Sequence, residues 1–397
     1  MTPTSQRGSR ALCIAFAAVC AAWWLHKLGW TPPVGQWDFR VYYFGAQAWR
    51  AGLDPYDPRV LPAELFGTGF KFNYPPYALA LFSPLTHLSV VHAMQIFLVV
   101  KLAALAWLLT IWSRLLRTGI ADPLWIVFLL FAYSSAIFVD VISGSVTTFE
   151  QLLVWLGVGA LLDRRYGAFA AAIVVASLFR LTPIALLVAA LVLPDRRGIR
   201  SVAAGLASAA AIAVTTALVA PQLTRGFLRS LPTNFGERGW LNPAALPLAD
   251  DLSAMIAQAR HVAPSPTLAL AIYGAIVAAV AVPTIATVRR IARQADAPHD
   301  ALIYFVFVAT ALVLPRFKNY SYMLLTVPTY YIATHSVQLR RAIPLVVIAC
   351  LPIYSWIATP DHLTFVADYS KWFIALGAWA LFLYELPCGS EVVPQRA

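Results

Sequence analysis

Long apolar runs separated by short polar segments make up most of the chain and predict membrane-spanning helices. Leu, Ala and Val fill these runs without the alternation typical of strands, so we expect an all-α membrane protein. Each run is close to the roughly 20 apolar residues that a helix needs to cross the hydrocarbon core. The pattern predicts about ten spans, at residues 11–29, 88–113, 122–142, 147–162, 201–220, 267–288, 299–315, 319–337, 342–358 and 368–386.

The segment 166–194 does not fit this pattern. Asp-Arg-Arg triplets flank it at 163–165 and 195–197, and its middle carries Arg180 and Pro183. Twenty-nine residues are too few for two complete spans. We therefore expect a re-entrant hairpin of two half-helices that meet at 180–183, since broken helices at membrane depth are tolerated where they line a cavity. The alternative is one long kinked span, which would invert the topology of everything after it.

Basic residues in the short connections predict the orientation. With the hairpin, the connections around 143–146 and 359–367 have no Lys or Arg, whereas the connections on the opposite face are rich in Arg. The positive-inside rule then places both termini in the cytoplasm and the long loops 30–87 and 221–266 outside the cell membrane. The first run, 11–29, has a cleaved signal peptide as its alternative, but the tryptophans near its end favour a retained anchor.

Composition agrees with a bilayer protein. Hydrophobic residues make up 60% of the 397 residues and charged residues only 12%, about half the usual share in soluble domains. This excludes a soluble enzyme and a nucleic-acid-binding module, so the formal charge of +11 is read as topology. The four cysteines and the Asp250-Asp251 pair lack metal-ligand spacing, and we expect neither a metal nor a cofactor. Since no internal repeat is found, we expect a single membrane domain over residues 1–397.

The first outer loop contains a predicted surface helix. Asp38 is placed to begin a helix of about 14 residues, which Gly52 would end before Pro55 and Pro58. An apolar face could lie on the bilayer surface; it comprises Val41, Tyr42, Phe44, Ala48 and Trp49. The later apolar run 77–86 is too short to span, so it should dip into the membrane or lie flat.

These residues also carry a resemblance to a known family. Asp38 just after the first span, then Val41-Tyr42-Tyr43, a small-residue helix, Gly52-Leu53-Asp54-Pro55-Tyr56-Asp57-Pro58 and Tyr74-Pro75-Pro76 before Leu81-Phe82-Ser83-Pro84-Leu85 make up the pattern. It resembles the integral-membrane glycosyltransferases of the C-type superfamily, and most of all glycosyltransferase family 87, the mannosyl- and arabinofuranosyltransferase-like group. The resemblance continues more weakly at 144–148, at 180–183 (where the family often has Lys) and at 315–322. That last stretch lacks the His of other branches, so their substrate class cannot be carried over.

The resemblance implies a sugar donor linked to polyprenyl phosphate, a glycolipid or polysaccharide acceptor, and inverting transfer on the outer face. Asp38 matches the acidic residue that acts as general base in the family. Elementary chemistry agrees, because a phosphate leaving group needs cations or oriented donors to hold its negative charge rather than a strong general acid. One carboxylate with basic residues therefore suffices. The alternative for Asp38 is a helix N-cap carboxylate.

Three basic residues are candidates for phosphate binding: Arg180, Arg316 and Lys318. Arg180 lies at the predicted hairpin tip, and a charge at such depth is a functional candidate by default. Its alternative is an ion pair with Asp140 or Glu150. Arg316 and Lys318 have interface anchoring as their alternative. Lys101 lies within a predicted span, where we expect a structural pair with Asp140.

The candidates for sugar or acceptor binding are polar side chains near the outer interface. They are Tyr42, Tyr43, Asn73, Tyr74, Asp140, Glu150 and Asn319. For Asp140 and Glu150 the alternative is capping and ion pairing, and for the tyrosines it is aromatic packing. A transporter or flippase is the competing function, because of the broken hairpin and the intramembrane charges, and a non-catalytic scaffold is the third. Dependence on Asp38 indicates the transferase, and dependence on Arg180 and Lys101 with an incidental Asp38 indicates the transporter.

Overall fold

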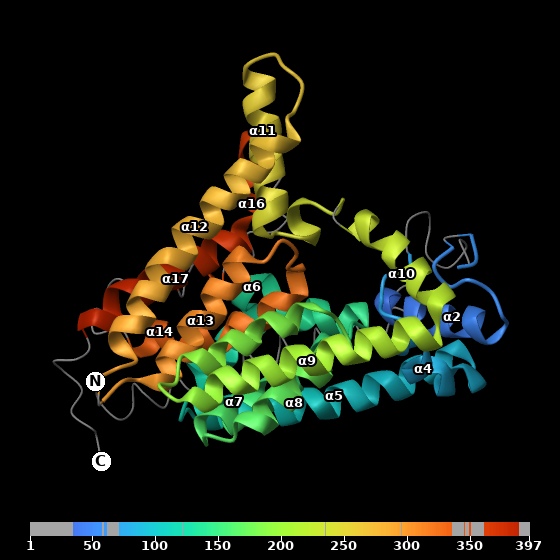
Figure 1. The fold of residues 1–397 in the computed structure, drawn as a ribbon, viewed down its shortest axis with the longest axis horizontal. Coiled ribbons are helices and arrows are strands. Elements are labelled where there is room, and N and C mark those ends of the chain that lie inside the picture. Colours follow the sequence, from blue (N-terminus) through green and yellow to red (C-terminus); the bar gives the residue numbers. More distant parts are fainter. Residues whose placement is uncertain are drawn as a thin grey trace. The chain divides into compact units, whose positions relative to one another are not determined.

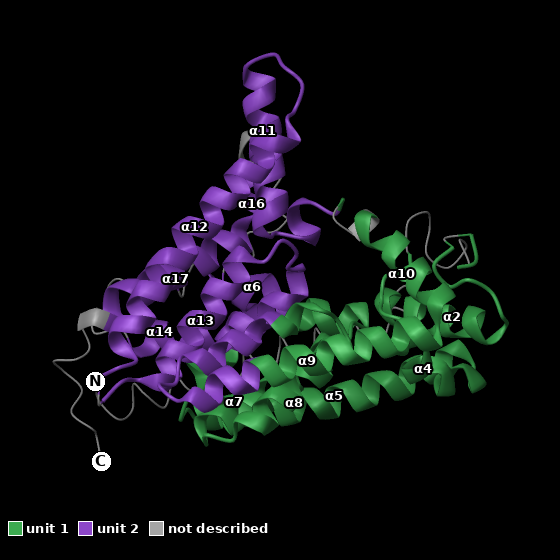
Figure 2. Ribbon diagram, viewed as in Figure 1, with its two compact units in different colours: residues 1–126, 137–184, 203–236 green, residues 127–136, 185–202, 237–397 purple. Residues whose placement is uncertain are grey.

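The computed structural model describes residues 35–57, 59–61, 71–120, 122–234, 236–294, 296–335, 345, 349–350 and 361–388. All regular structure in these ranges is helical, as the sequence predicts (Figure 1). The expected span 11–29 and most of 342–358 lie outside the described residues. The chain forms two compact units, coloured separately in Figure 2. The expectation of a single domain stays a prediction.

Unit 1 comprises Met1–Ile126, Ile137–Ile184 and Ala203–Gly236. Its helices are α2 (Trp37–Arg50), α4 (Tyr77–Phe82), η1 (Ser83–His87), α5 (Val90–Leu115), α7 (Thr147–Leu162), α8 (Tyr166–Ser177), most of α9 (Arg196–Val219) and α10 (Pro221–Asn234). Helix α7 packs against both α5 and α8, and α2 packs against α4, η1 and α5.

Unit 2 comprises Val127–Ala136, Ala185–Val202 and Glu237–Ala397. Its helices are most of η2 (Thr182–Leu191), η3 (Gly239–Leu241), α11 (Ala245–Ala259), α12 (Pro266–Ile291), α13 (His299–Val313), η4 (Asn319–Leu325), α14 (Thr326–His335), α16 (Asp361–Asp368) and α17 (Ser370–Cys388). Helix α13 contacts α12, α14 and α17, and its apolar side chains are almost all buried. Helix α6 (Pro123–Ser143) contributes to both units.

Four helices of the described chain are long and apolar enough to cross a membrane: α5, α6, α9 and α12. The expected spans 147–162 and 299–315 correspond to the shorter apolar helices α7 and α13. The expected span 319–337 is not one α-helix, because its first turns form the 3₁₀ segment η4. The full count of about ten crossings and the outward orientation of the long loops stay predictions.

The segment 166–194 is interrupted near the position that the sequence indicates. Helix α8 ends at Ser177 and η2 begins at Thr182, so Arg180 lies in the connection. The second of the two expected half-helices is a 3₁₀ helix. That the two pieces enter and leave on one side of the membrane stays a prediction.

Helix α6 carries a break that the sequence did not predict. Tyr133, Ser134 and Ser135 have φ values of 54°, 52° and 58°, the left-handed region that L side chains rarely adopt. Such kinks are usually found at Pro or Gly, and this stretch contains neither. The expected helix 122–142 is therefore correct in extent but not continuous.

Candidate active site

Helix α2 places Asp38, and its ends follow from local sequence. It runs over the 14 residues Trp37–Arg50, and Gly52 adopts φ +76° just beyond the C-cap, as the sequence predicts. Gln36, not Asp38, occupies the N-cap position, so the N-cap alternative for Asp38 is wrong. Asp38 lies in the first turn with 8% of its surface exposed. The partial positive charge of a helix N-terminus favours a carboxylate there.

The apolar face of α2 is packed inside the protein rather than exposed to a bilayer surface. Val41, Tyr42 and Ala48 are buried. Phe44 and Trp49 are partly buried and pack against the buried cluster that contains Val41 and Phe72. The spacing of apolar residues along the helix identifies this face but does not show whether lipid or protein covers it. The expected position on the bilayer surface was wrong for this reason. The short apolar run 77–86 forms α4 and η1, and both of these helices pack against α2.

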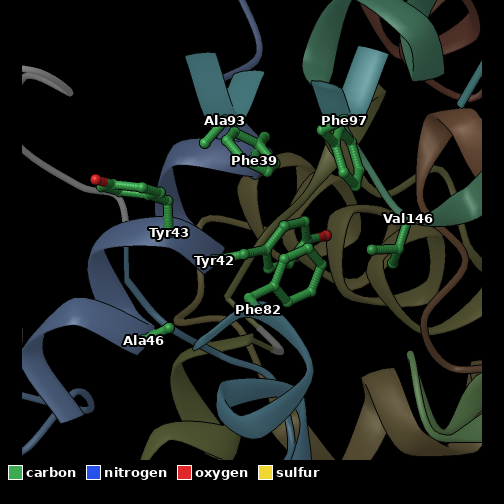
Figure 3. Packing of buried hydrophobic residues seen from close by; sticks show 8 residues of the cluster. All are labelled: Phe39, Tyr42, Tyr43, Ala46, Phe82, Ala93, Phe97 and Val146. Atoms are coloured by element: carbon green, nitrogen blue, oxygen red, sulfur yellow. The ribbon is translucent and has the colours of Figure 1, made fainter. Parts of the chain in front are cut away.

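The two tyrosines of α2 have different surroundings (Figure 3). Tyr42 stacks on Phe82 with ring centroids 4.5 Å apart, and Tyr74 meets it edge-on at 4.5 Å. The Tyr43 hydroxyl instead donates to the Leu88 carbonyl oxygen at 2.7 Å. In Figure 3 the Tyr43 ring points away from the Tyr42–Phe82 stack. The two tyrosines of α2 thus share one buried cluster, against which Tyr74 packs, and they differ in that the Tyr43 hydroxyl has a backbone acceptor.

A polar loop at 142–148 lies directly against the start of α2. The Gln36 N–H donates to the Ile142 carbonyl oxygen at 2.7 Å. Gly144 has φ +69°, and a Cβ placed on it would lie 2.9 Å from the Cβ atoms of both Gln36 and Phe39. Only glycine suits this backbone and this approach. The loop and Asp38 are therefore held together by contacts on either side of Asp38.

The loop binds Arg180 through two hydroxyl groups. The Arg180 guanidinium donates to Thr147 Oγ1 at 2.8 Å and to Ser145 Oγ at 2.6 Å. Both acceptors are buried. These hydrogen bonds fix the direction of a charged side chain at the break between α8 and η2. Sequence analysis identified residues 144–148 as part of the family resemblance but did not connect them with Arg180.

Lys101 also binds the loop at 142–148 and the end of α6 that precedes it. Its ammonium group lies 2.9 Å from Asp140 Oδ2, and both side chains are completely buried, which confirms the expected pair. It also donates to the Asp140 carbonyl oxygen, and to that of Ser145 at 2.6 Å. Thr148 donates to the Asp140 carboxylate as well. Asp140 thus has a structural role, and its predicted role in sugar binding stays a prediction.

Tyr74 connects the carboxylate and the guanidinium electrostatically. Burial raises the pKa of the Tyr74 phenol and Asp38 raises it further, whereas Arg180 and Tyr42 lower it. These interactions connect Tyr74 with Tyr42, Arg180 and Asp38. The structure thus brings together four of the candidates from the sequence: Asp38, Tyr42, Tyr74 and Arg180.

Glu150 and Asn73 are the remaining candidates in unit 1. Glu150 is 4% exposed, and its charge interacts with that of Arg180. Its Oε1 accepts a long hydrogen bond of 3.4 Å from Gln151, while no donor among the described residues reaches Oε2. The Asn73 Oδ1 atom is likewise buried without a donor in the described part of the chain. Both side chains thus offer buried acceptor atoms.

Arg316 and Lys318 form a separate group in unit 2. Glu237 accepts from Arg316 at 2.7 Å and from Lys318 at 3.0 Å. Asn319 is buried, and its Oδ1 accepts from the Tyr320 N–H at 2.7 Å. Sequence analysis did not single out Glu237 as the partner of these cations, because 79 residues separate it from Arg316. A phosphate role for Arg316 and Lys318 stays a prediction.

The Glu237 group predicts a dependence of stability on acid. Burial raises the pKa of Glu237, but Lys318 and Arg316 together bring it below the usual 4.5. A depressed folded-state pKa stabilises the fold above the unfolded-state pKa, and this contribution is lost as pH falls through the folded-state value. At pH values below about 4.5 we expect the midpoint temperature of thermal unfolding to fall. In Glu237→Gln the same acidification should lower this temperature by less, as measured by nanoscale differential scanning fluorimetry. An equal drop in the variant would contradict this.

Gly144 yields a second prediction. Gly144→Ala should lower the free energy of unfolding by about 1–3 kcal/mol, since the new Cβ meets α2 and the backbone is left-handed. Gly159→Ala is the matched control, because its Cβ would meet nothing within 4 Å. That variant should be neutral or slightly stabilising. Denaturant titration measures the free energy of unfolding of both variants. Equal free energies would contradict the packing of Gly144 against α2.

The described part of the chain is helical and contains four helices that are long and apolar enough to cross a membrane. The sequence model of glycosyltransferase family 87 matches residues 72–315, well over half of the chain. The chain therefore belongs to glycosyltransferase family 87 and is a membrane glycosyltransferase. Comparison with curated proteins and with solved structures gives no match. The matched range includes Lys101, Asp140 and Arg180, and Asp38 precedes it.

Proposed function

We propose that the protein transfers a hexose or pentose from a polyprenyl-phosphate-linked donor to a glycolipid or polysaccharide acceptor on the extracytoplasmic face of the cell membrane. The observation that carries this proposal is the grouping of Asp38, Tyr74 and Arg180 in unit 1. It supplies one carboxylate and one cation, the set that displacement of a phosphate requires. Membrane-length helices in the same chain suit a donor that is anchored in the bilayer.

The proposed reaction is a single displacement. An acceptor hydroxyl attacks the anomeric carbon while Asp38 takes its proton as general base. The bond between the anomeric carbon and the phosphate oxygen breaks, and polyprenyl phosphate leaves with the electron pair. Arg180 stabilises the negative charge on that phosphate. Attack opposite to the leaving group inverts the anomeric configuration.

Polar acceptor atoms near this group suit a sugar. Glu150 Oε2 and Asn73 Oδ1 are buried without donors among the described residues, and sugar hydroxyls are donors. The Tyr42–Tyr74 pair offers an aromatic surface on which a sugar ring can pack. Arg316, Lys318 and Asn319 of unit 2 are kept as further candidates for phosphate and acceptor contacts.

Donor turnover tests the proposed function. The purified chain in lipid nanodiscs is incubated with a panel of polyprenyl-phosphate sugars and a membrane glycolipid extract, and free polyprenyl phosphate is followed by mass spectrometry. Release that needs both donor and acceptor establishes the transfer and identifies the donor. Absence of release with every donor and acceptor fraction would overturn it and favour the transporter or flippase alternative, for which uptake of labelled lipid into proteoliposomes is then the direct measurement.

Arg180 has its own expected result. Arg180→Gln should raise the donor KM and weaken inhibition by free polyprenyl phosphate roughly tenfold or more, because a charge-assisted contact to phosphate is lost. Arg165→Gln is the control, since Arg165 is exposed and pairs only with its exposed neighbour Asp163 among the ion pairs of the described residues. Initial rates against donor concentration give both constants. Unchanged inhibition by the lipid phosphate would remove Arg180 from the phosphate site.

A further inference from the structure

A large cavity in unit 1 lies away from the residues proposed for the reaction. Its volume is about 1220 Å³. The end of α2 and the following loop line one side, and the junction of α9 with α10 lines the other. The lining includes Trp49, Leu53, Val219, Arg225 and Arg229 but none of the reaction candidates. It is therefore a separate site.

Helix α10 is fixed against the loop by a close contact. A Cβ on Gly226 would lie 2.7 Å from the Tyr56 ring, so only glycine allows this approach. Phe227 and Ser230 of the same helix are also buried. Another face of α10 carries Arg225 and Arg229, which lie one turn apart, are exposed, and both line the cavity. The helix thus presents two arginines on the same face.

The position of the cavity points to the bilayer interface. Val219 is the last residue of α9, one of the four membrane-length helices. A 24-residue helix is about 36 Å long and exceeds the roughly 30 Å of hydrocarbon. Its end therefore reaches the level of the lipid headgroups, where a tryptophan such as Trp49 is also favoured.

The lining is amphipathic. Val219 is 79% exposed, Leu228 55% and Leu53 52%, and all three border the same cavity as the two arginines. The only acid of this lining, Asp54, lies 3.5 Å from Arg229, and the side chains of Asp54 and Arg229 are 45% and 74% exposed. Such a pair contributes little to stability, so an incoming anion can replace it. A smaller cavity of about 320 Å³ shares Asp54 and Arg229 and adds Lys71, together with Arg59, which is paired with Asp57.

We infer that this cavity binds the phosphate headgroup of an anionic bilayer lipid. Arg225 and Arg229 hold the phosphate oxygens, and an acyl chain lies along Val219 and Leu228. Arginine suits phosphate because its guanidinium donates two parallel hydrogen bonds. Neither a soluble anion nor a neutral lipid uses both parts of the lining. This inference does not depend on the proposed transfer reaction.

Native mass spectrometry of the whole chain in detergent tests the inference. Wild-type protein should retain phosphatidylglycerol at least several-fold more than phosphatidylcholine. Arg225→Gln/Arg229→Gln should bind phosphatidylglycerol roughly tenfold more weakly. The charge-matched control Arg260→Gln/Arg293→Gln, which changes two exposed arginines outside the cavity, should bind as wild type does.

Three outcomes would overturn the inference: equal retention of the two lipids, an equal loss in the control variant, or full displacement of phosphatidylglycerol by millimolar inorganic phosphate. The last would identify a site for a soluble anion. Should the double variant fail to fold, wild-type protein is washed at low and at high salt. Retention of phosphatidylglycerol that falls with salt concentration supports headgroups held by arginine. Retention that does not change with salt concentration overturns the inference.

Discussion

Asp38→Asn should abolish sugar transfer, with a loss of at least about 10²-fold in kcat, the usual contribution of a general base. The amide has nearly the same size as the carboxylate but cannot take the acceptor proton. Helix α2 should still form, because Gln36 and not Asp38 occupies its N-cap. Loss of the charge at the helix start costs up to about 2 kcal/mol, because Asp38 is buried. Release of polyprenyl phosphate in nanodiscs measures the effect, with the donor that wild type uses.

The control for this variant lies in the segment that follows α2. Asp57 is paired with Arg59 at the surface, so Asp57→Asn removes a carboxylate without touching the Asp38 group. That variant should retain near-normal turnover. Thermal unfolding of both variants separates loss of chemistry from loss of fold. Near-normal turnover by Asp38→Asn would discard Asp38 as the base, while leaving the chain a transferase.

Lys101→Met should be the most destabilising single change in unit 1, at about 3–5 kcal/mol. The substitution leaves the buried Asp140 carboxyl group without its cation. It also removes the donor to the carbonyl oxygens of Asp140 and Ser145, which fixes the loop that holds Arg180. Transfer should therefore fall as well, through a displaced Arg180 rather than through contact with substrate. Unfolding in mixed micelles measures the first effect and donor turnover the second.

A second substitution separates charge from packing. Lys101→Met/Asp140→Asn removes both charges, and the amide oxygen introduced at position 140 can still accept from Thr148, so part of the lost stability should return. Lys71→Met is the control, since this lysine is exposed and its replacement should change stability by no more than about 0.5 kcal/mol. A Lys101→Met protein as stable as this control would contradict the anchoring role.

Local signals in the sequence predicted part of this structure well. Gly52 and the prolines after it gave the end of α2 correctly, because a helix terminus depends on the conformational preferences of a few adjacent residues. The Lys101–Asp140 pair could be expected, because charges within apolar helices require partners. The break at Tyr133–Ser135 could not, because neither Pro nor Gly marks it.

The individual residues of the candidate site could be selected from the sequence, but their arrangement in space could not. Asp38, Tyr74 and Arg180 were each selected from type and position, yet their proximity depends on packing across more than 140 residues. The fit of Gly144 against Gln36 and Phe39 brings two of these regions together. The hydroxyls of Ser145 and Thr147 as partners of Arg180 had no signal of their own, since Ser and Thr are common in any loop.

The buried pair of Lys101 and Asp140 also has a consequence for biogenesis. Lys101 lies near the middle of α5, and a lone lysine at the centre of an inserting helix costs about 2.5–3.5 kcal/mol. Its carboxylate partner arrives on α6, after a connection of only a few residues. Insertion of the two helices as one unit neutralises both charges before either meets lipid. The translocon should therefore release α5 together with α6, and a nascent chain that stops before Asp140 should integrate α5 poorly.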